Sequence, residues 1–254
     1  PKFQGKIVMI TGGSGTIGFA IAEAFSKLGA QTILVDKDET ALKKAVTKLG
    51  VGHAYFPIDV TETDAADQAM LAAIQNFGGL DILVSNAGAA HAGPMLSISN
   101  DELRNAFELN FFSHYSFSTE AAKILKNQNR GGQILFNISK QAVNPGKNFG
   151  AYGLPKATTF FLMRQLALEL GSDGIRVNGI NADRIRSGLL TEDFISSRAK
   201  SRGVSETEYM AGNLLNKEVK AEHVANAFTS LACAESTTGH VMTVDGGNIE
   251  ASLR

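Results

Sequence analysis

One stretch decides the fold: Ile7-Val8-Met9-Ile10-Thr11-Gly12-Gly13-Ser14-Gly15-Thr16-Ile17-Gly18. It begins with a short apolar run, which is typical of a buried parallel strand. From Ile17 to Leu28 apolar residues recur at helical spacing, and Gly29 ends that pattern. The stretch therefore predicts a strand, a glycine-rich turn and a helix. Such a turn offers backbone N–H groups at a helix N-terminus, where the helix dipole favours a phosphate.

Strand and helix patterns alternate along the rest of the chain. Further strands are predicted at 32–35, 54–56, 81–85, 134–138, 175–180 and 240–244, and helices at 38–49, 101–127, 151–171 and 221–234, with one more, capped by Thr61 or Thr63, that ends near 77. This order predicts an α/β fold: a single doubly wound Rossmann domain, residues 1–254, with a parallel sheet of about seven strands. The less regular stretch 183–216, with a helix over 207–215, is predicted to be a substrate lid.

Composition excludes several classes of protein. The chain has 254 residues and a formal net charge of −1, so no basic surplus favours nucleic acid or an anionic membrane as partner. No apolar run approaches the roughly 20 residues that a membrane helix needs, and residues 1–6 are too polar for a signal peptide. Cys233 is the only cysteine, which indicates a reducing compartment, and we expect a cytoplasmic protein. The five histidines lie far apart, so no metal site is expected.

The glycine turn predicts a dinucleotide site. Gly12, Gly15 and Gly18 follow a strand and open a helix, and Asp36 stands 18 residues further on. A carboxylate there can accept hydrogen bonds from a ribose diol and would repel a 2′-phosphate, which favours NAD over NADP. Lys37 is the counter-argument, because a cation at this place could tolerate the phosphate.

A second motif predicts the chemistry. Tyr152 and Lys156 are four residues apart in a predicted helix, so they share one face. The ammonium should favour the phenolate and lower the pKa of the tyrosine from about 10. A dinucleotide site together with a tunable proton donor indicates hydride transfer between an alcohol and a carbonyl.

With these motifs the chain resembles the short-chain dehydrogenase/reductase family over residues 5 to 248. The resemblance rests on Thr11–Gly18, Asp59-Val60, Asn86-Ala87-Gly88, Asn110, Ser139, Tyr152-x-x-x-Lys156 and Thr238-Gly239…Asp245-Gly246-Gly247. It implies a catalytic tetrad of Asn110, Ser139, Tyr152 and Lys156. In this set Asn110 marks a helix irregularity and holds a water that relays protons to Lys156. It also implies a homodimer or homotetramer built from the helices at 101–127 and 151–171, where Phe111, Phe112, Phe160 and Phe161 are compatible with contact and equally with a core face.

The resemblance also implies which residues hold the cofactor. These are Gly12, Ser14, Gly15, Thr16, Ile17, Gly18, Asp36, Asp59, Val60, Asn86, Ala87, Gly88, Tyr152, Lys156, Ile185 and Ser187. Asp59 and Val60 would hold the adenine, and Lys156 the nicotinamide ribose. Ile185 and Ser187 are candidates for contact with the nicotinamide carboxamide, because Ala182-Asp183 replaces the family's usual Pro-Gly.

The spacing of the glycines leaves a rival class open. Single-domain members of the family usually carry glycine at the place of Thr16, whereas Gly12-x-x-Gly15-x-x-Gly18 is nearer to epimerase-like members. The alternatives are therefore an NAD-dependent sugar epimerase or dehydratase, and a non-catalytic NAD-sensing module. Enoyl reduction is less expected, since that branch usually spaces tyrosine and lysine further apart.

The region 140–254 is similar to the dehydrogenase half of bifunctional aldolase/short-chain dehydrogenases. The similarity lies in Lys140–Val143, Asn181–Leu190 and Tyr209–Leu215. It implies carbohydrate metabolism and a lactaldehyde-like substrate, in line with a small polar hydroxy, oxo or sugar-derived compound. The candidate pocket walls are 89–95, 141–149 and the lid, where Arg184, Arg186, Lys147 and His91 could meet a carboxylate, a phosphate or sugar hydroxyls.

Overall fold

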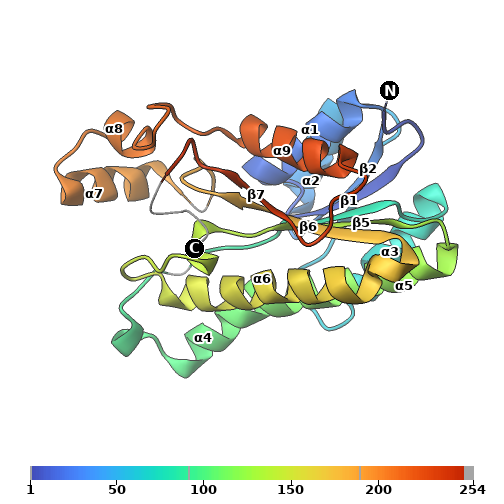
Figure 1. Ribbon diagram of the computed structural model, residues 1–254, viewed down its shortest axis with the longest axis horizontal. Helices are drawn as coiled ribbons and strands as arrows, with labels where there is room; N and C mark the ends of the chain where they lie inside the picture. Colours follow the sequence, from blue (N-terminus) through green and yellow to red (C-terminus); the bar gives the residue numbers. More distant parts are fainter. Residues whose placement is uncertain (1, 91, 189, 249–254) are drawn as a thin grey trace.

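Seven parallel strands form the central sheet of the computed structural model, which describes residues 2–90, 92–188 and 190–248 (Figure 1). All five side chains of β1 (Ile7–Thr11) are buried, because helices cover both faces of the sheet. The other strands are β2 (Gln31–Asp36), β3 (Ala54–Pro57), β4 (Ile82–Ser85), β5 (Gly132–Asn137), β6 (Ile175–Ala182) and β7 (Val241–Val244). The predicted α/β fold with a parallel seven-stranded sheet is confirmed.

The strand order places a crevice at the middle of the sheet. The order is β3-β2-β1-β4-β5-β6-β7, so the chain reverses direction across the sheet between β1 and β4. These two strands pair in parallel, with Val8 opposite Ile82 and Ile10 opposite Val84. In open sheets of this kind ligands bind beyond the carboxyl ends of the strands at the reversal. The turns after β1 and β4 both lie there.

Two helical layers cover the sheet (Figure 1). The helices α1 (Thr16–Lys27), α2 (Glu39–Leu49) and α9 (Ala221–Cys233) pack on one face, around Phe25 and Phe228. The helices α3 (Ala65–Phe77), α5 (Ser113–Gln128) and α6 (Gly150–Leu170) pack on the other, around Phe117 and Phe136. No described helix has the length and apolar composition required to cross a bilayer.

The long helix predicted over 101–127 is interrupted. It consists of α4 (Asn100–Phe107), a π-helical turn (Glu108–Phe112) and α5. The N-terminus of α4 is stabilised by a capping box that Ser99 and Glu102 form. A π turn leaves backbone groups out of the regular α-helical ladder and often marks a functional site. The irregularity that the family resemblance implied at Asn110 is confirmed.

The stretch 183–216 carries two helices, α7 (Glu192–Arg202) and α8 (Glu206–Met210). They hold a small apolar cluster of their own, with Leu190, Ile195 and Tyr209 buried in it, and they project beyond the sheet (Figure 1). The predicted helix at 207–215 ends five residues early, and α7 was not predicted, because its sequence is mostly polar and shows no helical periodicity.

Another expectation is wrong at the start of α3. Neither Thr61 nor Thr63 caps this helix, since its N-cap position is Asp64. The hydroxyl of Thr61 donates instead to Asp59 Oδ1 at 2.8 Å. The Thr61 side chain therefore stabilises the loop before α3 and does not cap the helix.

Candidate functional site

A cleft of about 970 Å³ opens beyond the carboxyl ends of the strands. All but two of the residues predicted for catalysis and cofactor binding line it, the exceptions being Ser14 and Asn110. Ser14 lies behind Asp36, and Asn110 is buried, 1% exposed. Among the described residues no group of three or more His, Cys, Asp or Glu side chains could hold a metal ion.

The glycine turn after β1 is built for close backbone approach. A Cβ at Gly18 would lie 2.1 Å from the carbonyl oxygen of Gly12, and Gly12 itself has a φ of +64°. Gly15 is the N-cap of α1 and offers no side-chain cap to the first-turn amides. Thr16 and Ile17, in that first turn, line the cleft. Uncapped amides at a helix N-terminus suit a pyrophosphate.

Asp36 closes one end of the cleft. Its Oδ2 accepts hydrogen bonds from the Ser14 hydroxyl at 2.7 Å and from the Ser14 amide at 3.2 Å. Its Oδ1 accepts from the Lys37 amide at 2.8 Å. These bonds fix the carboxylate against the glycine turn, where a ribose diol could reach its remaining lone pairs. We call this region, with Asp59 and Val60 beside it, the adenosine end.

Asn86 ties the ends of three strands together. Its side-chain amide donates to the carbonyl of Thr11 at 3.0 Å, and its Oδ1 accepts from Asn137 Nδ2 at 2.9 Å. The Thr11 hydroxyl accepts from the amides of Asn86 and Ala87 at 2.9 and 3.1 Å. The turn after β4 is therefore bonded to β1 on one side and to β5 on the other.

Tyr152 lies in the first turn of α6, where it is 7% exposed and lines the cleft. Burial raises the pKa of its phenol to about 12, and a side-chain hydrogen bond with Ser139 opposes that rise. The expected fall in the pKa of Tyr152 is therefore wrong. Desolvation is the larger cause, and the Lys156 amine lies 5.8 Å from the centre of the ring.

Lys156 lies one turn further along α6 and is 2% exposed. Its Nζ donates to the carbonyl of Asn137 at 3.0 Å and lies 3.4 Å from His114 Nε2. Burial lowers the pKa of Lys156 to about 7, because the charged form is deprived of water. The two residues thus lie on one face of the helix, as predicted, and the same burial shifts their pKa values in opposite directions.

His114 belongs to this cluster, although it was not among the predicted site residues. It is 1% exposed, and its Nδ1 lies 2.6 Å from the Ser85 hydroxyl. Burial first, and then the nearby Lys156, lower the pKa of the imidazole well below its usual value of 6.5. A neutral ring can accept a hydrogen bond from the ammonium. The sequence feature that could have indicated His114 is its position four residues after Asn110 in the same predicted helix.

Asn110 lies in the π turn beneath Tyr152 and Lys156. Its backbone carbonyl accepts from the Thr159 hydroxyl at 2.7 Å, and its Nδ2 donates to Ala89 O at 3.0 Å. Its Oδ1 is buried and has no hydrogen-bond partner in the described chain. A Cβ at Gly88 would lie 2.9 Å from this oxygen and 3.5 Å from Lys156 Nζ, so the turn after β4 passes between them only as glycine.

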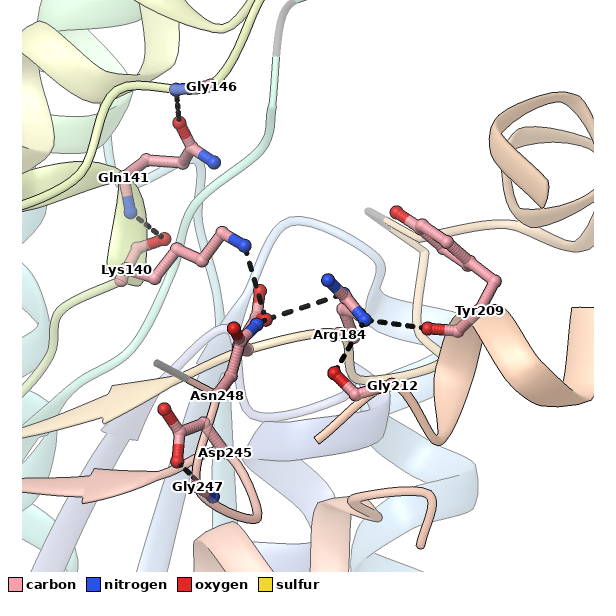
Figure 2. Close-up of polar contacts among 11 residues, drawn as sticks. Lys140, Gln141, Gly146, Arg184, Tyr209, Gly212, Asp245, Gly247 and Asn248 are labelled. Atoms are coloured by element: carbon pink, nitrogen blue, oxygen red, sulfur yellow. Dashed lines mark hydrogen bonds and ion pairs between the residues drawn. The ribbon is translucent and has the colours of Figure 1, made fainter. Parts of the chain in front are cut away.

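A polar network fills the place of the expected Pro-Gly (Figure 2). Asp183 accepts from Lys140 Nζ at 3.3 Å and from Asn248 Nδ2 at 2.5 Å, and Arg184 Nε lies 3.5 Å away. Arg184 has a φ of +53°, which costs a non-glycine residue about 1 kcal/mol or more. Its guanidinium donates to Tyr209 O at 2.7 Å, which holds the strained residue in place. Ile185 and Ser187, just beyond, line the cleft.

The other end of the cleft, the substrate end, lies between the 140–149 loop and α7. The charged side chains that line it are Lys140, Lys147, Arg184, Arg198 and Arg202, with Asp183 as the carboxylate. Of the cations predicted to meet a substrate, Lys147 and Arg184 line the cleft, and Arg186 is paired instead with Glu218 and Glu192. His91 lies outside the described residues. Arg198 and Arg202 were missed, because their helix was not predicted.

The chain matches known proteins along nearly its whole length. A family model described as enoyl-(acyl carrier protein) reductase matches residues 13–248. An uncharacterized oxidoreductase, YuxG, of Bacillus subtilis (strain 168) is 34% identical over 259 residues, covering 97% of this chain and 38% of that protein. The chain thus spans less than half the length of this relative.

Two solved structures share the fold closely. L-sorbose reductase from Gluconobacter frateurii, complexed with NADPH and L-sorbose, has a TM-score of 0.88 at 29% identity, with 96% of this chain and 97% of that chain covered. The 3-ketoacyl-(acyl-carrier-protein) reductase from Brucella melitensis, complexed with NADH, has a TM-score of 0.85 at 26% identity, with 96% and 98% covered. Both relatives therefore hold a nicotinamide dinucleotide.

Proposed function

The chain belongs to the short-chain dehydrogenase/reductase family, and from that premise we propose that it is an NAD(P)-dependent oxidoreductase that interconverts an alcohol and a carbonyl. The observation that carries the proposal is the pair Tyr152 and Lys156. Both are buried on one face of α6 and line the same cleft as the glycine turn. When bound, a nicotinamide dinucleotide accepts a hydride from the alcohol carbon or returns it to the carbonyl.

Tyr152 is the proposed general acid and base. With a pKa of about 12 it holds its proton at neutral pH, so it can donate to a carbonyl oxygen during reduction. In the oxidation the phenolate form of Tyr152 would take the hydroxyl proton as the alcohol carbon loses its hydride. Ser139, whose hydroxyl accepts from the Gln141 amide at 3.2 Å, is the proposed second hydrogen-bond partner of the substrate oxygen.

Lys156 and Asn110 are proposed to support this proton transfer. The ammonium, anchored on Asn137 O and His114, has one further N–H to offer to a ribose hydroxyl or to water. Asn110 Oδ1 has no partner among the described residues and lies across Gly88 from it. A water between the two would satisfy both and relay protons to solvent.

NAD is the proposed cofactor rather than NADP. The cradle at Gly12 and Gly18 and the uncapped start of α1 fit a pyrophosphate. At the adenosine end Asp36 is held by Ser14, with no cation within salt-bridge distance of it among the described residues. A 2′-phosphate would face that carboxylate directly, at a cost of a few kcal/mol at about 4 Å.

The substrate is proposed to be a small polar hydroxy or oxo compound, sugar-derived or lactaldehyde-like, covered by 183–216 as a lid. The polar lining of the substrate end supports this class. L-sorbose reductase acts on a sugar, as its name says, and shares the fold. The longer Bacillus relative is compatible with the dehydrogenase half of a two-part protein.

A sugar epimerase is the second candidate, favoured by the spacing of Gly12, Gly15 and Gly18. An epimerase returns its hydride to the substrate, so no net NADH accumulates during turnover. Absorbance at the NADH band separates the two candidates. A non-catalytic NAD-sensing protein would bind NADH and turn over no member of the substrate panel.

The test is a panel of alcohols, aldehydes and sugars followed by NADH absorbance, with Tyr152→Phe beside the wild type. We expect kcat to fall by about a thousandfold while the Kd for NADH changes less than about threefold. Tyr55→Phe is the matched control, because Tyr55 lies in β3 and outside the cleft. Wild-type kcat in Tyr152→Phe would refute the assigned role.

A homodimer or homotetramer is also proposed, through α5 and α6. These helices and the π turn before α5 leave Phe112, Tyr115, Phe161 and Leu168 exposed by 45%, 47%, 67% and 80%. Burying such a surface against a second copy would remove apolar area from water. Light scattering of Phe161→Glu/Leu168→Glu should show a smaller species than the wild type, and equal masses would contradict this interface.

A further inference from the structure

We propose, on the basis of the function proposed above, that the substrate end of the cleft binds an anionic group, a carboxylate or a phosphate, through the guanidinium of Arg198. The substrate class then narrows to small hydroxy or oxo compounds that carry such a group. The site consists of Arg198 and Arg202 on α7 and Lys147 on the facing loop.

Arg198 is a partly buried cation with no ion pair in the described part of the chain. Its Nε is shielded from solvent and has no hydrogen-bond partner there, although the side chain lines the cleft. Withdrawing a guanidinium from water without an anion is costly. No carboxylate among the described residues pairs with it, and this leaves an external anion as the partner that the site lacks.

Two aromatic rings hold Arg198 in position. Its guanidinium carbon lies 5.3 Å from the centre of the Phe149 ring and 5.7 Å from that of Phe194, and the two rings pack edge to face. Ring faces attract a cation but leave its N–H donors unsatisfied. The planar donor fork of arginine matches a carboxylate or a phosphate in two parallel hydrogen bonds.

The neighbouring arginines, unlike Arg198, have hydrogen-bonding and charged partners within the described chain. Arg186 is paired with Glu218, at 2.7 Å, and with Glu192. Arg184 donates to two backbone carbonyls and lies beside Asp183. Asp183 Oδ2 also accepts from Lys140 and Asn248, so the lining carboxylate of this end already has a cation and an amide as partners.

Two further cations extend the positive surface of the site. Arg202 is one turn beyond Arg198 on α7, and its guanidinium lies 5.3 Å from the centre of the Tyr209 ring. Lys147 is exposed on the loop that precedes α6. All three line the cleft, and no ion pair of theirs occurs among the described residues. An anion there gains attraction from several charges in a partly desolvated setting.

The anion site and the Tyr152 phenol line the same cleft, away from the adenosine end. Phe149, which packs on Arg198, is the N-cap of α6, and its carbonyl accepts from the Tyr152 amide at 3.1 Å. The cleft's other carboxylates, Asp36 and Asp59, lie at the far end with Lys37. A substrate held by Arg198 through its charged group would therefore present its hydroxyl or carbonyl toward Tyr152.

The experiment uses substrate pairs that share a carbon skeleton and differ in charge. Glyceraldehyde and its phosphate ester form the phosphate arm, and a butanediol and the corresponding hydroxybutyrate form the carboxylate arm. In at least one pair we expect the charged compound to have a kcat/KM about tenfold or more above that of the neutral compound. The pair that shows this preference identifies the anionic group as a phosphate or a carboxylate. In Arg198→Met this preference should fall by on the order of ten- to a hundredfold.

Lys200→Met is the matched control. Lys200 is an exposed cation on α7, the helix that carries Arg198, but its side chain does not line the cleft. This variant should keep the wild-type preference. Arg198→Lys retains charge without the donor fork and should recover part of the preference. Equal losses for charged and neutral members in Arg198→Met would make Arg198 a packing residue, and a preference for neutral members in both arms would overturn the proposal.

A binding measurement separates this inference from the proposed reaction. With NADH saturating, inorganic phosphate or acetate should raise the Tm of the wild type above that in chloride at equal ionic strength, and not that of Arg198→Met. If neither anion does so, the anion site is refuted even where neutral substrates turn over. If an anion binds through Arg198 but no compound exchanges hydride, the anion site is supported and the proposed oxidoreductase activity is refuted.

Discussion

The adenosine end and the substrate end of the cleft are built from different parts of the chain. At the adenosine end the lining consists of backbone at Gly12 and Gly18 and one short carboxylate, Asp36, held by the adjacent turn. At the substrate end it consists of long cationic side chains from a loop and from α7, such as Arg198. The first end is fixed by local geometry and the second by contacts across distant segments. Substitutions at the two ends should therefore fail in different ways.

The largest effect is expected at Gly18. Alanine there would bring Cβ to 2.1 Å from the Gly12 carbonyl oxygen, so the turn must open and its phosphate cradle is lost. We expect the affinity of Gly18→Ala for NADH to fall by about a hundredfold or more, as measured by fluorescence titration. Gly188→Ala at the substrate end, where a Cβ meets nothing within 4 Å, is the control and should bind NADH normally. Equal affinities in the two variants would show that the turn is not rigid.

A smaller effect is expected at Asp36. Asp36→Ala removes the carboxylate that faces the proposed ribose diol and relieves its repulsion of a 2′-phosphate. The ratio of kcat/KM with NADP to that with NAD should rise by on the order of ten- to a hundredfold. Asp38→Ala is the matched control, since Asp38 caps α2 through the Ala41 amide and does not line the cleft. An unchanged ratio in Asp36→Ala would argue that cofactor choice is made elsewhere.

Between the two ends, Lys156 predicts a pH dependence of stability. Burial lowers its pKa from the ordinary value of 10.5 to about 7, so between these pH values the unfolded chain binds one more proton than the folded chain. The free energy of unfolding should therefore rise with pH from about 7 toward 10, and this contribution should be flat below pH 7.

Lys156→Met should remove that slope. We expect the Tm of the wild type, relative to that of the variant, to rise by about 5 °C between pH 7 and 10. The comparison across pH cancels the constant loss of the bond to Asn137 O. Lys200→Met should keep the wild-type slope, because Lys200 is exposed. Parallel Tm curves for wild type and Lys156→Met would mean that the amine is hydrated in solution.

The smallest effect is expected at Lys37. Its side chain is 75% exposed and lies 3.7 Å from Asp59, so it neither neutralises Asp36 nor holds a fixed place at the adenosine end. Lys37→Ala should change the NADP to NAD ratio by less than about threefold. A larger fall, measured by the same kinetics as for Asp36→Ala, would make this lysine a phosphate ligand and weaken the preference proposed for NAD.

The fold could be predicted because its signals are local. Strand and helix periods, the Gly12–Gly18 turn and the apolar run of β1 each depend on neighbours in sequence. The break at Asn110 was accessible only through family resemblance, since the flanking helical pattern is continuous. The cap at Thr61 was wrong because a nearer partner, Asp59, competed for the hydroxyl.

The site was predictable only in part. The pair Tyr152 and Lys156 is one helical turn apart, so its geometry follows from spacing. The pKa of Tyr152 could not be predicted from spacing, because it depends on burial by residues from other elements. His114 and Arg198 were missed because each contacts a residue far away in sequence, Lys156 at 42 positions and Phe149 at 49 positions. For Arg198 the helix that carries it was not predicted either.

The side chain of Asn86 limits how freely the phosphate turn can be exchanged for one from another enzyme. It links Thr11, at the mouth of that turn, to Asn137, whose carbonyl anchors the buried amine. A grafted loop that lacks the Thr11 hydroxyl would lose its bonds to the amides of Asn86 and Ala87. Such a graft would then disturb the position of the Lys156 amine through Asn137. Single substitutions at Asp36 are a safer route than transplanting the loop.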